Sequence, residues 1–242
     1  LDQIVNENLL TPKGVYGFFH ANNVGDDIYV YDENYNHIET FYFLRQQMKK
    51  KDDTPNRSLA DFIAPKSSDI KDFIGAFSVT SGKEVEILAK KYRDDNDDYS
   101  CILIQAIGDR LAEAYAEFLH EVTRKEWGYA ENENLSIADM IKENYQGIRP
   151  AAGYPACPDH TEKQTLFRLL ETKKYTNIRL TDSFAMTPAS SVSGLYFSHP
   201  ESRYFPLGRI DKEQSADYAK RKGWSQKKVE KWLSPNLGYE PS

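Results

Sequence analysis

The residues best placed to do chemistry lie in one run, Gly147 to Lys163, here called the motif loop. It carries one arginine, Arg149, and its prolines and glycines restrict the backbone around that side chain. A guanidinium offers two parallel donors to a carboxylate or phosphate, and a stiff loop reduces the entropy lost on binding. A proline-rich corner whose arginine pairs with a neighbouring acid is the alternative, and the composition leaves both open.

Two dipeptides shape this loop. Pro150 and Pro155 bias Arg149 and Tyr154 towards extended backbone, because a proline disfavours the helical region for the residue before it. Gly153 permits a turn or a close approach that a side chain would forbid. The spacing therefore predicts a shaped binding loop rather than a linker.

The run from Arg149 to Lys163 resembles the signature of the C-terminal activation domain of cobalamin-dependent methionine synthase. In that family the Arg-x-x-x-Gly-Tyr motif lies in the S-adenosylmethionine site. Nearly the whole chain is covered, because further segments resemble the family in its own order. These segments are residues 21–27, 61–66, 109–114, 143–147, 191–200 and 234–239.

The resemblance implies a set of site residues. Arg149, Ala151, Tyr204 and Phe205 match positions that contribute to the S-adenosylmethionine site of the family. Arg149 would take the ligand carboxylate, the backbone of Ala151 the adenine or ribose, and the two aromatic rings would supply further contact. The family often has tyrosine where this chain has Phe205, so a hydroxyl contact is lost there.

Other groups would complete the site. Glu143 or Glu113 would face the cationic end of S-adenosylmethionine, although Glu113 also fits a surface position on a long helix. Tyr154, beside Gly153, is expected to face the corrin of cobalamin. We expect no metal ligands, because the histidines show no paired ligand spacing.

The resemblance also implies a function and partners. An activation domain of this family binds S-adenosylmethionine and supports reductive methylation of cob(II)alamin to methylcobalamin. The cobalamin is held by a neighbouring domain of the same polypeptide, and a flavodoxin-like or reductase donor supplies one electron. The chain would thus be part of methionine synthase, the 5-methyltetrahydrofolate-homocysteine methyltransferase.

One other function stays open, and another is disfavoured. The chain could be a partner-docking interaction module that binds no cofactor. An independent methyltransferase is disfavoured, because no glycine-rich strand-to-helix turn of the dinucleotide-binding type occurs. We find no nucleophile paired with a base, and Cys157 has no adjacent cation to lower its pKa. The chain alone is therefore not expected to catalyse turnover of a substrate.

Composition bounds these alternatives. The 242 residues are 40% hydrophobic and 28% charged, which is enough for a full core, and the net charge of -6 argues against a nucleic-acid partner. Two cysteines without Cys-x-x-Cys spacing fit a reducing, cytoplasmic setting, and no apolar run approaches the ~20 residues of a membrane span. The C-terminal helices carry a group of basic residues that could steer an acidic electron donor or simply form a solvated helix face, namely Lys220, Arg221, Lys222, Lys227, Lys228 and Lys231.

The boundaries of the chain suggest a fragment. It begins with Leu1, and the family domain begins further upstream, with helical segments and an Asp-Trp run whose aspartate contacts S-adenosylmethionine. No Asp-Trp occurs in this sequence. Residues 1–242 are therefore expected to be a single activation domain, a C-terminal fragment lacking the N-terminal helical part.

The hydrophobic pattern predicts an α+β fold, an antiparallel sheet flanked by several helices. A Ser81/Glu84 capping box should open the first long helix, and Ser136, Asp159 with Glu162, and Ser225 should cap later ones. Residues 49–56 should form a charged loop. Strands are expected at 15–20, 28–31, 38–43, 73–80, 184–186, 193–197 and 204–210, and helices at 81–92, 99–127, 140–145, 163–170 and 215–233, the last broken at Gly223.

Overall fold

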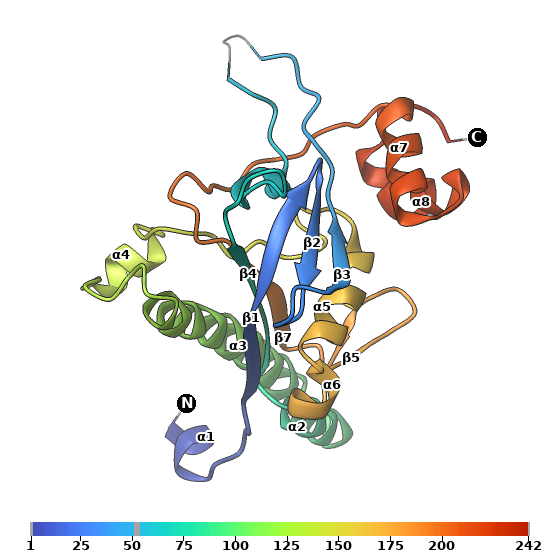
Figure 1. Cartoon of the computed structure of the whole chain (residues 1–242). Coiled ribbons are helices and arrows are strands. Elements are labelled where there is room, and N and C mark those ends of the chain that lie inside the picture. Colours follow the sequence, from blue (N-terminus) through green and yellow to red (C-terminus); the bar gives the residue numbers. More distant parts are fainter. Residues whose placement is uncertain (1, 51–53, 242) are drawn as a thin grey trace. The chain divides into compact units, whose positions relative to one another are not determined.

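The structure is a computed structural model that describes residues 2–50 and 54–241 (Figure 1). Part of the predicted charged loop, residues 51–53, therefore lies outside the described residues. Contacts divide the chain into two compact units. Unit 1 comprises residues 1–17, 76–145 and 167–193, and unit 2 comprises residues 18–75, 146–166 and 194–242.

A five-stranded sheet has the order β3-β2-β1-β4-β7. β1 pairs antiparallel with β2, and β2 pairs antiparallel with β3, with a register shift between Val30 and Tyr31. The predicted antiparallel sheet with flanking helices is thereby confirmed. The five strands are β1 (Lys13–Val24), β2 (Asp27–Tyr31), β3 (His37–Tyr42), β4 (Asp72–Thr80) and β7 (Ser191–Tyr196).

Unit 1 is built on the pair of α2 (Glu84–Asp94) and α3 (Asp98–Glu126), which run side by side (Figure 1). Buried residues recur along α3 every three or four positions, as its sequence period predicts. Gly108 of α3 allows the close approach, since a Cβ there would lie 2.8 Å from the Val85 side chain of α2. The unit also contains α1 (Asp2–Asn6), α4 (Ile137–Ile141), α6 (Thr172–Thr176), β5 (Arg179–Leu180) and β6 (Met186–Thr187).

Unit 2 holds the motif loop and a C-terminal helix pair, α7 (Lys212–Lys222) and α8 (Gln226–Leu233), visible in red in Figure 1. Gly223, at φ 64°, ends α7, and Ser225 caps α8, as predicted. The pair encloses a hydrophobic core of Leu44, Leu207, Ile210, Tyr218, Ala219, Val229, Leu233 and Leu237. The remaining elements are η1 (Leu59–Phe62), η2 (His160–Glu162), α5 (Lys163–Leu169), which continues into unit 1, and η3 (Ser234–Asn236).

Four local predictions are corrected. The Ser81/Glu84 capping box is wrong, because the Ser81 hydroxyl donates to the carbonyl of Gly108 and α2 begins after Lys83 without a side-chain cap. The first strand was predicted to end at residue 20, but β1 continues to Val24 and the turn falls at Gly25.

Residues 204–210 were expected to be a strand but run as irregular chain, with only an isolated bridge at Ile210. Pro206 lacks the N–H that a strand pairing would need. Glu162, expected as a cap with Asp159, instead accepts from the backbone N–H of Tyr42 at 2.9 Å. Asp159 does cap η2.

Candidate functional site

The motif loop begins on the edge of the sheet. Ile148 and Phe197 exchange both backbone hydrogen bonds at 3.0 Å, and the N–H of Leu195 donates to the carbonyl of Pro150 at 2.9 Å. Arg149 therefore sits between two anchored residues, which restrains its backbone on both sides.

A tight turn follows Arg149. The N–H of Gly153 donates to the carbonyl of Cys157 at 2.7 Å, and the N–H of Cys157 donates to the carbonyl of Tyr154 at 2.9 Å. Gly153 has φ 99°, and a Cβ there would lie 2.1 Å from the His160 ring. The glycine is required twice, for its backbone conformation and for the space it leaves.

The segment that follows β7 lies against this loop. The Tyr204 hydroxyl accepts the backbone N–H of Arg149 at 3.0 Å, and the N–H of Leu207 donates to the carbonyl of Pro155 at 2.8 Å. Residues 55 positions apart, which only the resemblance linked, are thus in direct contact. Arg149 and Ala151 are both half-buried.

The two predicted aromatic residues differ in their surroundings. Tyr204 is 45% exposed, whereas Phe205 is 7% exposed and its ring centroid lies 6.4 Å from that of Phe62. Tyr204 can therefore meet a ligand directly, while Phe205 anchors the segment in the core.

The two candidate glutamates belong to unit 1, apart from the motif loop in unit 2. Glu113 lies on an exposed face of α3 and pairs with Arg110 at 2.6 Å. Glu143 is exposed and has a left-handed backbone, φ 54°. Both glutamates are exposed to solvent.

A cavity of about 420 Å³ opens beside the turn. Gly153 and Tyr154, the two residues predicted to face the corrin, both line this cavity. The side chain of Tyr154 is 67% exposed. Its lining is mostly apolar or proline, contributed by Gly153, Tyr154, Pro155, Pro158, His160, Pro206, Leu207, Gly208, Trp232, Pro235 and Asn236.

A buried charge cluster supports the far end of the loop. The Lys222 ammonium bonds the Asp159 carboxylate at 2.7 Å, the Glu162 carboxylate at 2.6 Å and the Thr161 hydroxyl at 2.8 Å. The Tyr218 hydroxyl also donates to Asp159 at 2.8 Å. Sequence reasoning missed this cluster, since Lys222 looked like one of several helix lysines and no local signal separates it.

Burial and charge set the protonation of this cluster. Burial raises the pKa of Glu162 to about 7, against the attraction of Lys222. Burial also opposes ionisation of Asp159, but the Lys222 ammonium and the hydrogen bonds outweigh it and hold the pKa of Asp159 below its usual value. Asp159 and Lys222 are thus a charged pair, with Glu162 titrating near neutrality.

Two further groups of the loop have shifted pKa values. Burial raises the pKa of the Cys157 thiol well above its usual value, so the thiol stays protonated and is a poor nucleophile. Burial and the Lys163 ammonium lower the pKa of His160, which keeps its ring neutral beneath Gly153.

Within residues 2–50 and 54–241, which the structure describes, no three His, Cys, Asp or Glu side chains gather in a group able to hold a metal ion. Among the helices of those same residues, none has the length and apolar character needed to cross a membrane.

The fold and the loop together define an α+β binding domain whose candidate site lies on one preorganised segment. The family model described as vitamin B12 dependent methionine synthase, activation domain, matches residues 1–223, and the chain belongs to this family. The chain is also similar to a solved structure, the MetH reactivation domain bound to AdoHcy, with a TM-score of 0.96 and 55% identity. That match covers 99% of this chain and 74% of the other.

Proposed function

We propose that this chain binds S-adenosylmethionine at the motif loop and supports the reductive methylation of cobalamin in methionine synthase. Family membership supports the role, and the solved relative with 55% identity is a complex with AdoHcy, which is S-adenosylmethionine without its methyl group. The observation that carries the proposal for this chain is the contact between Arg149 and Tyr204, which joins the two segments expected to hold the ligand.

Arg149 would clamp the ligand carboxylate with two parallel donors. Its backbone is fixed by its neighbours and by Tyr204, so little backbone freedom is left to lose on binding. The backbone of Ala151 would meet the adenine or ribose, and the Tyr204 ring would supply apolar contact. Glu143 or Glu113 would offset the positive end of the ligand.

Tyr154 and Gly153 would face the cobalamin held by the neighbouring domain of the same polypeptide. The exposed tyrosine and the apolar cavity beside it suit a large, flat, partly apolar partner. When bound by its own domain and reduced by one electron from a flavodoxin-like or reductase donor, cobalamin would supply the nucleophile that takes the methyl group, with AdoHcy as the leaving group. The part of this chain is to bind and align S-adenosylmethionine and to exclude water, which makes the transfer effectively intramolecular.

The chain by itself would be a binding part of the methyltransferase, without turnover of its own. The buried Cys157 thiol cannot serve as the nucleophile because its pKa is raised. Incubation with methyl-labelled S-adenosylmethionine and small acceptors should transfer no label in the absence of cobalamin. Label transfer under those conditions would favour an independent methyltransferase.

Calorimetric titration of S-adenosylmethionine tests the binding proposal directly. Arg149→Ala should weaken binding by on the order of 2–4 kcal/mol, because the ligand carboxylate loses its partner. Arg149→Lys should also bind less well, since an ammonium cannot form the bidentate contact. Equal affinity of the parent and both variants would instead favour an interaction module that binds no cofactor.

A further inference from the structure

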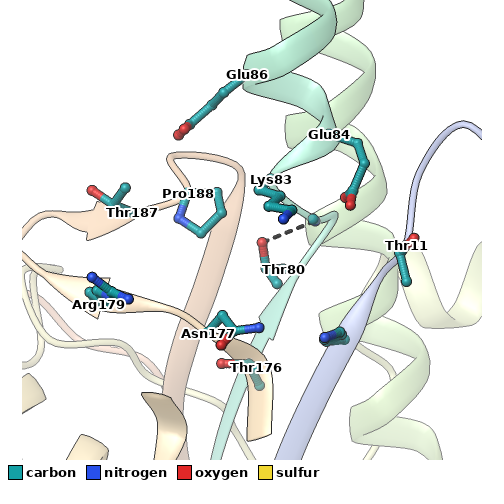
Figure 2. Close-up of a pocket in the computed structure, with 12 residues that line it drawn as sticks. Thr11, Thr80, Lys83, Glu84, Glu86, Thr176, Asn177, Arg179, Thr187 and Pro188 are labelled. Carbon is teal, nitrogen blue, oxygen red and sulfur yellow. Dashed lines mark hydrogen bonds between the residues drawn. The ribbon is translucent and has the colours of Figure 1, made fainter. Parts of the chain in front are cut away.

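A second cavity, of about 600 Å³, lies wholly within unit 1 and includes none of the predicted site residues. Figure 2 shows side chains converging on it from the end of β4, the start of α2, the turn between α6 and β5, and the turn after β6. It is lined by Thr11, Lys13, Thr80, Gly82, Lys83, Glu84, Glu86, Thr176, Asn177, Arg179, Thr187 and Pro188.

The floor and the rim of this cavity differ. Thr80, Gly82, Thr176 and Pro188 are buried and form the floor. The charged residues at the rim are exposed, except Glu84, which is half-buried. A cavity of this volume suits a small molecule of nucleotide size. A convex protein surface would reach the rim but not the buried floor.

Three cations from three separate elements meet at the rim. Lys13 starts β1, Lys83 precedes α2 and Arg179 lies in β5. None of the three takes part in an ion pair with another side chain of the described residues. The cavity thus holds three cations against the two carboxylates Glu84 and Glu86, and cations without an ion-pair partner are an arrangement expected of an anion site.

The two carboxylates at the cavity do not cancel these cations directly. Glu86 accepts the backbone N–H of Ala189 at 3.0 Å, so it is engaged with the fold. One carboxylate oxygen of Glu84 is buried and accepts no hydrogen bond in the described structure. This acceptor is unused, and rotation of the Glu84 side chain out of its buried position would present it to an N–H or O–H donor of a ligand, such as a base or a sugar.

The start of α2 adds a fourth favourable feature. This helix has 11 residues and no side-chain cap on its first N–H groups, which therefore offer donors and the positive end of the helix dipole. Lys83 stands at that end of the helix. Cations, free helix donors and an unused acceptor thus share one hollow.

We propose that this cavity is a binding site for a small phosphate-bearing ligand of the nucleoside phosphate class. The phosphate lies among Lys13, Lys83 and Arg179 at the start of α2, and a donor of the nucleoside part reaches Glu84. The site is independent of the motif loop, because its residues belong to unit 1 alone.

Titration of the chain with inorganic pyrophosphate and with uridine diphosphate tests this site. Both probes lack adenine, so neither resembles S-adenosylmethionine. Both should bind at low salt, and uridine diphosphate should bind more tightly. Lys83→Met and Arg179→Gln should each weaken pyrophosphate binding at least tenfold, and exposed positions should tolerate both changes without loss of fold.

Lys91→Met is the matched control, since Lys91 is an exposed lysine of α2 in its last turn, away from the cavity. It should leave both affinities unchanged, as should Arg149→Ala in the motif loop. Equal losses in Lys83→Met and Lys91→Met would reveal unspecific charge attraction and overturn the proposal. The absence of pyrophosphate binding would also overturn the proposal. This includes the outcome in which an acidic protein binds at the cavity but pyrophosphate does not.

Discussion

The Lys222 ammonium lies 2.7 Å from the Asp159 carboxylate, although the two side chains are only 5% and 2% exposed. The pair links the end of α7 to the last turn of the motif loop. Because Asp159 also caps η2 at Thr161, the pair holds the chain that places His160 beneath Gly153. The C-terminal helix pair therefore supports the candidate site through two residues that lie 63 positions apart in the chain.

Lys222→Met should destabilise the chain strongly. It leaves the Asp159 and Glu162 carboxylates buried without their cation, and removal of one partner of a buried ion pair typically costs about 3–5 kcal/mol. Urea denaturation gives the free energy of unfolding. Lys220→Met, at an exposed position of the same helix, is the control and should change it little. Similar curves for the two variants would show that the buried pair contributes nothing special.

The stability of the chain should fall as the pH rises through neutrality. Glu162 has an ordinary pKa of 4.5, and burial raises it to about 7 in the folded chain. Between these values the folded state binds more protons than the unfolded state, so raising the pH lowers the free energy of unfolding. The contribution of Glu162 is fully present below pH 4.5 and is lost near pH 7.

Glu162→Gln should remove this part of the pH dependence, because an amide does not titrate. Urea denaturation at pH 5 and pH 8 should show a smaller difference for the variant than for the parent. Glu201→Gln, at an exposed turn, is the control and should keep the parent slope. An unchanged slope in Glu162→Gln would place the titration on another group.

Tyr204→Phe should weaken S-adenosylmethionine binding without unfolding the chain. It removes the hydroxyl that accepts the backbone N–H of Arg149, a hydrogen bond of roughly 1 kcal/mol, or about fivefold in affinity. Calorimetry measures the affinity and a thermal melt the fold. Tyr99→Phe, at a 76% exposed tyrosine of unit 1, should change neither. If Tyr204→Phe bound S-adenosylmethionine as tightly as the parent, the hydrogen bond between Arg149 and Tyr204 would have no role in ligand binding.

Gly153→Ala should distort the turn that presents Tyr154. The new Cβ would meet the His160 ring at 2.1 Å and would also occupy a positive φ of 99°. We expect at least a tenfold loss of S-adenosylmethionine affinity. Gly25→Ala is the control for the strain of a positive φ alone, because Gly25 has φ 65° with nothing within 4 Å of the added Cβ. A thermal melt should show a larger loss of stability for Gly153→Ala than for Gly25→Ala, and equal losses would show that the clash with His160 adds nothing.

Reversal of Lys227 and Lys228 to glutamate in the full-length enzyme should slow reductive reactivation at low salt. Both lysines are exposed on α8, and Lys228 also lies 3.7 Å from the centroid of the Trp224 ring. An acidic flavodoxin-like donor would be attracted by this surface, and salt should screen the effect. S-adenosylmethionine affinity should not change. Reversal of Lys90 and Lys91 on α2 is the control, and an equal slowing there would remove α8 from the docking surface.

Local patterns in the sequence determined most of the elements. The spacing of apolar residues predicted α3 from Tyr99 to Trp127, and the structure has it at Asp98–Glu126. Ser136 and Ser225 cap their helices as predicted, because capping is decided within four residues. The motif loop and its resemblance to a family were likewise readable without coordinates, since they depend on residue types in order.

Only the tertiary structure decided which distant residues meet. It took Ser81 from its predicted cap to the carbonyl of Gly108, because a buried hydroxyl satisfies the nearest open acceptor whatever its place in the chain. Packing buries Lys222 in an ion pair with Asp159, although its sequence surroundings resemble those of the other helix lysines. Packing also places Lys13, Lys83 and Arg179 at one cavity. Such contacts depend on how the elements pack against one another, and the residues adjacent in sequence do not determine that packing.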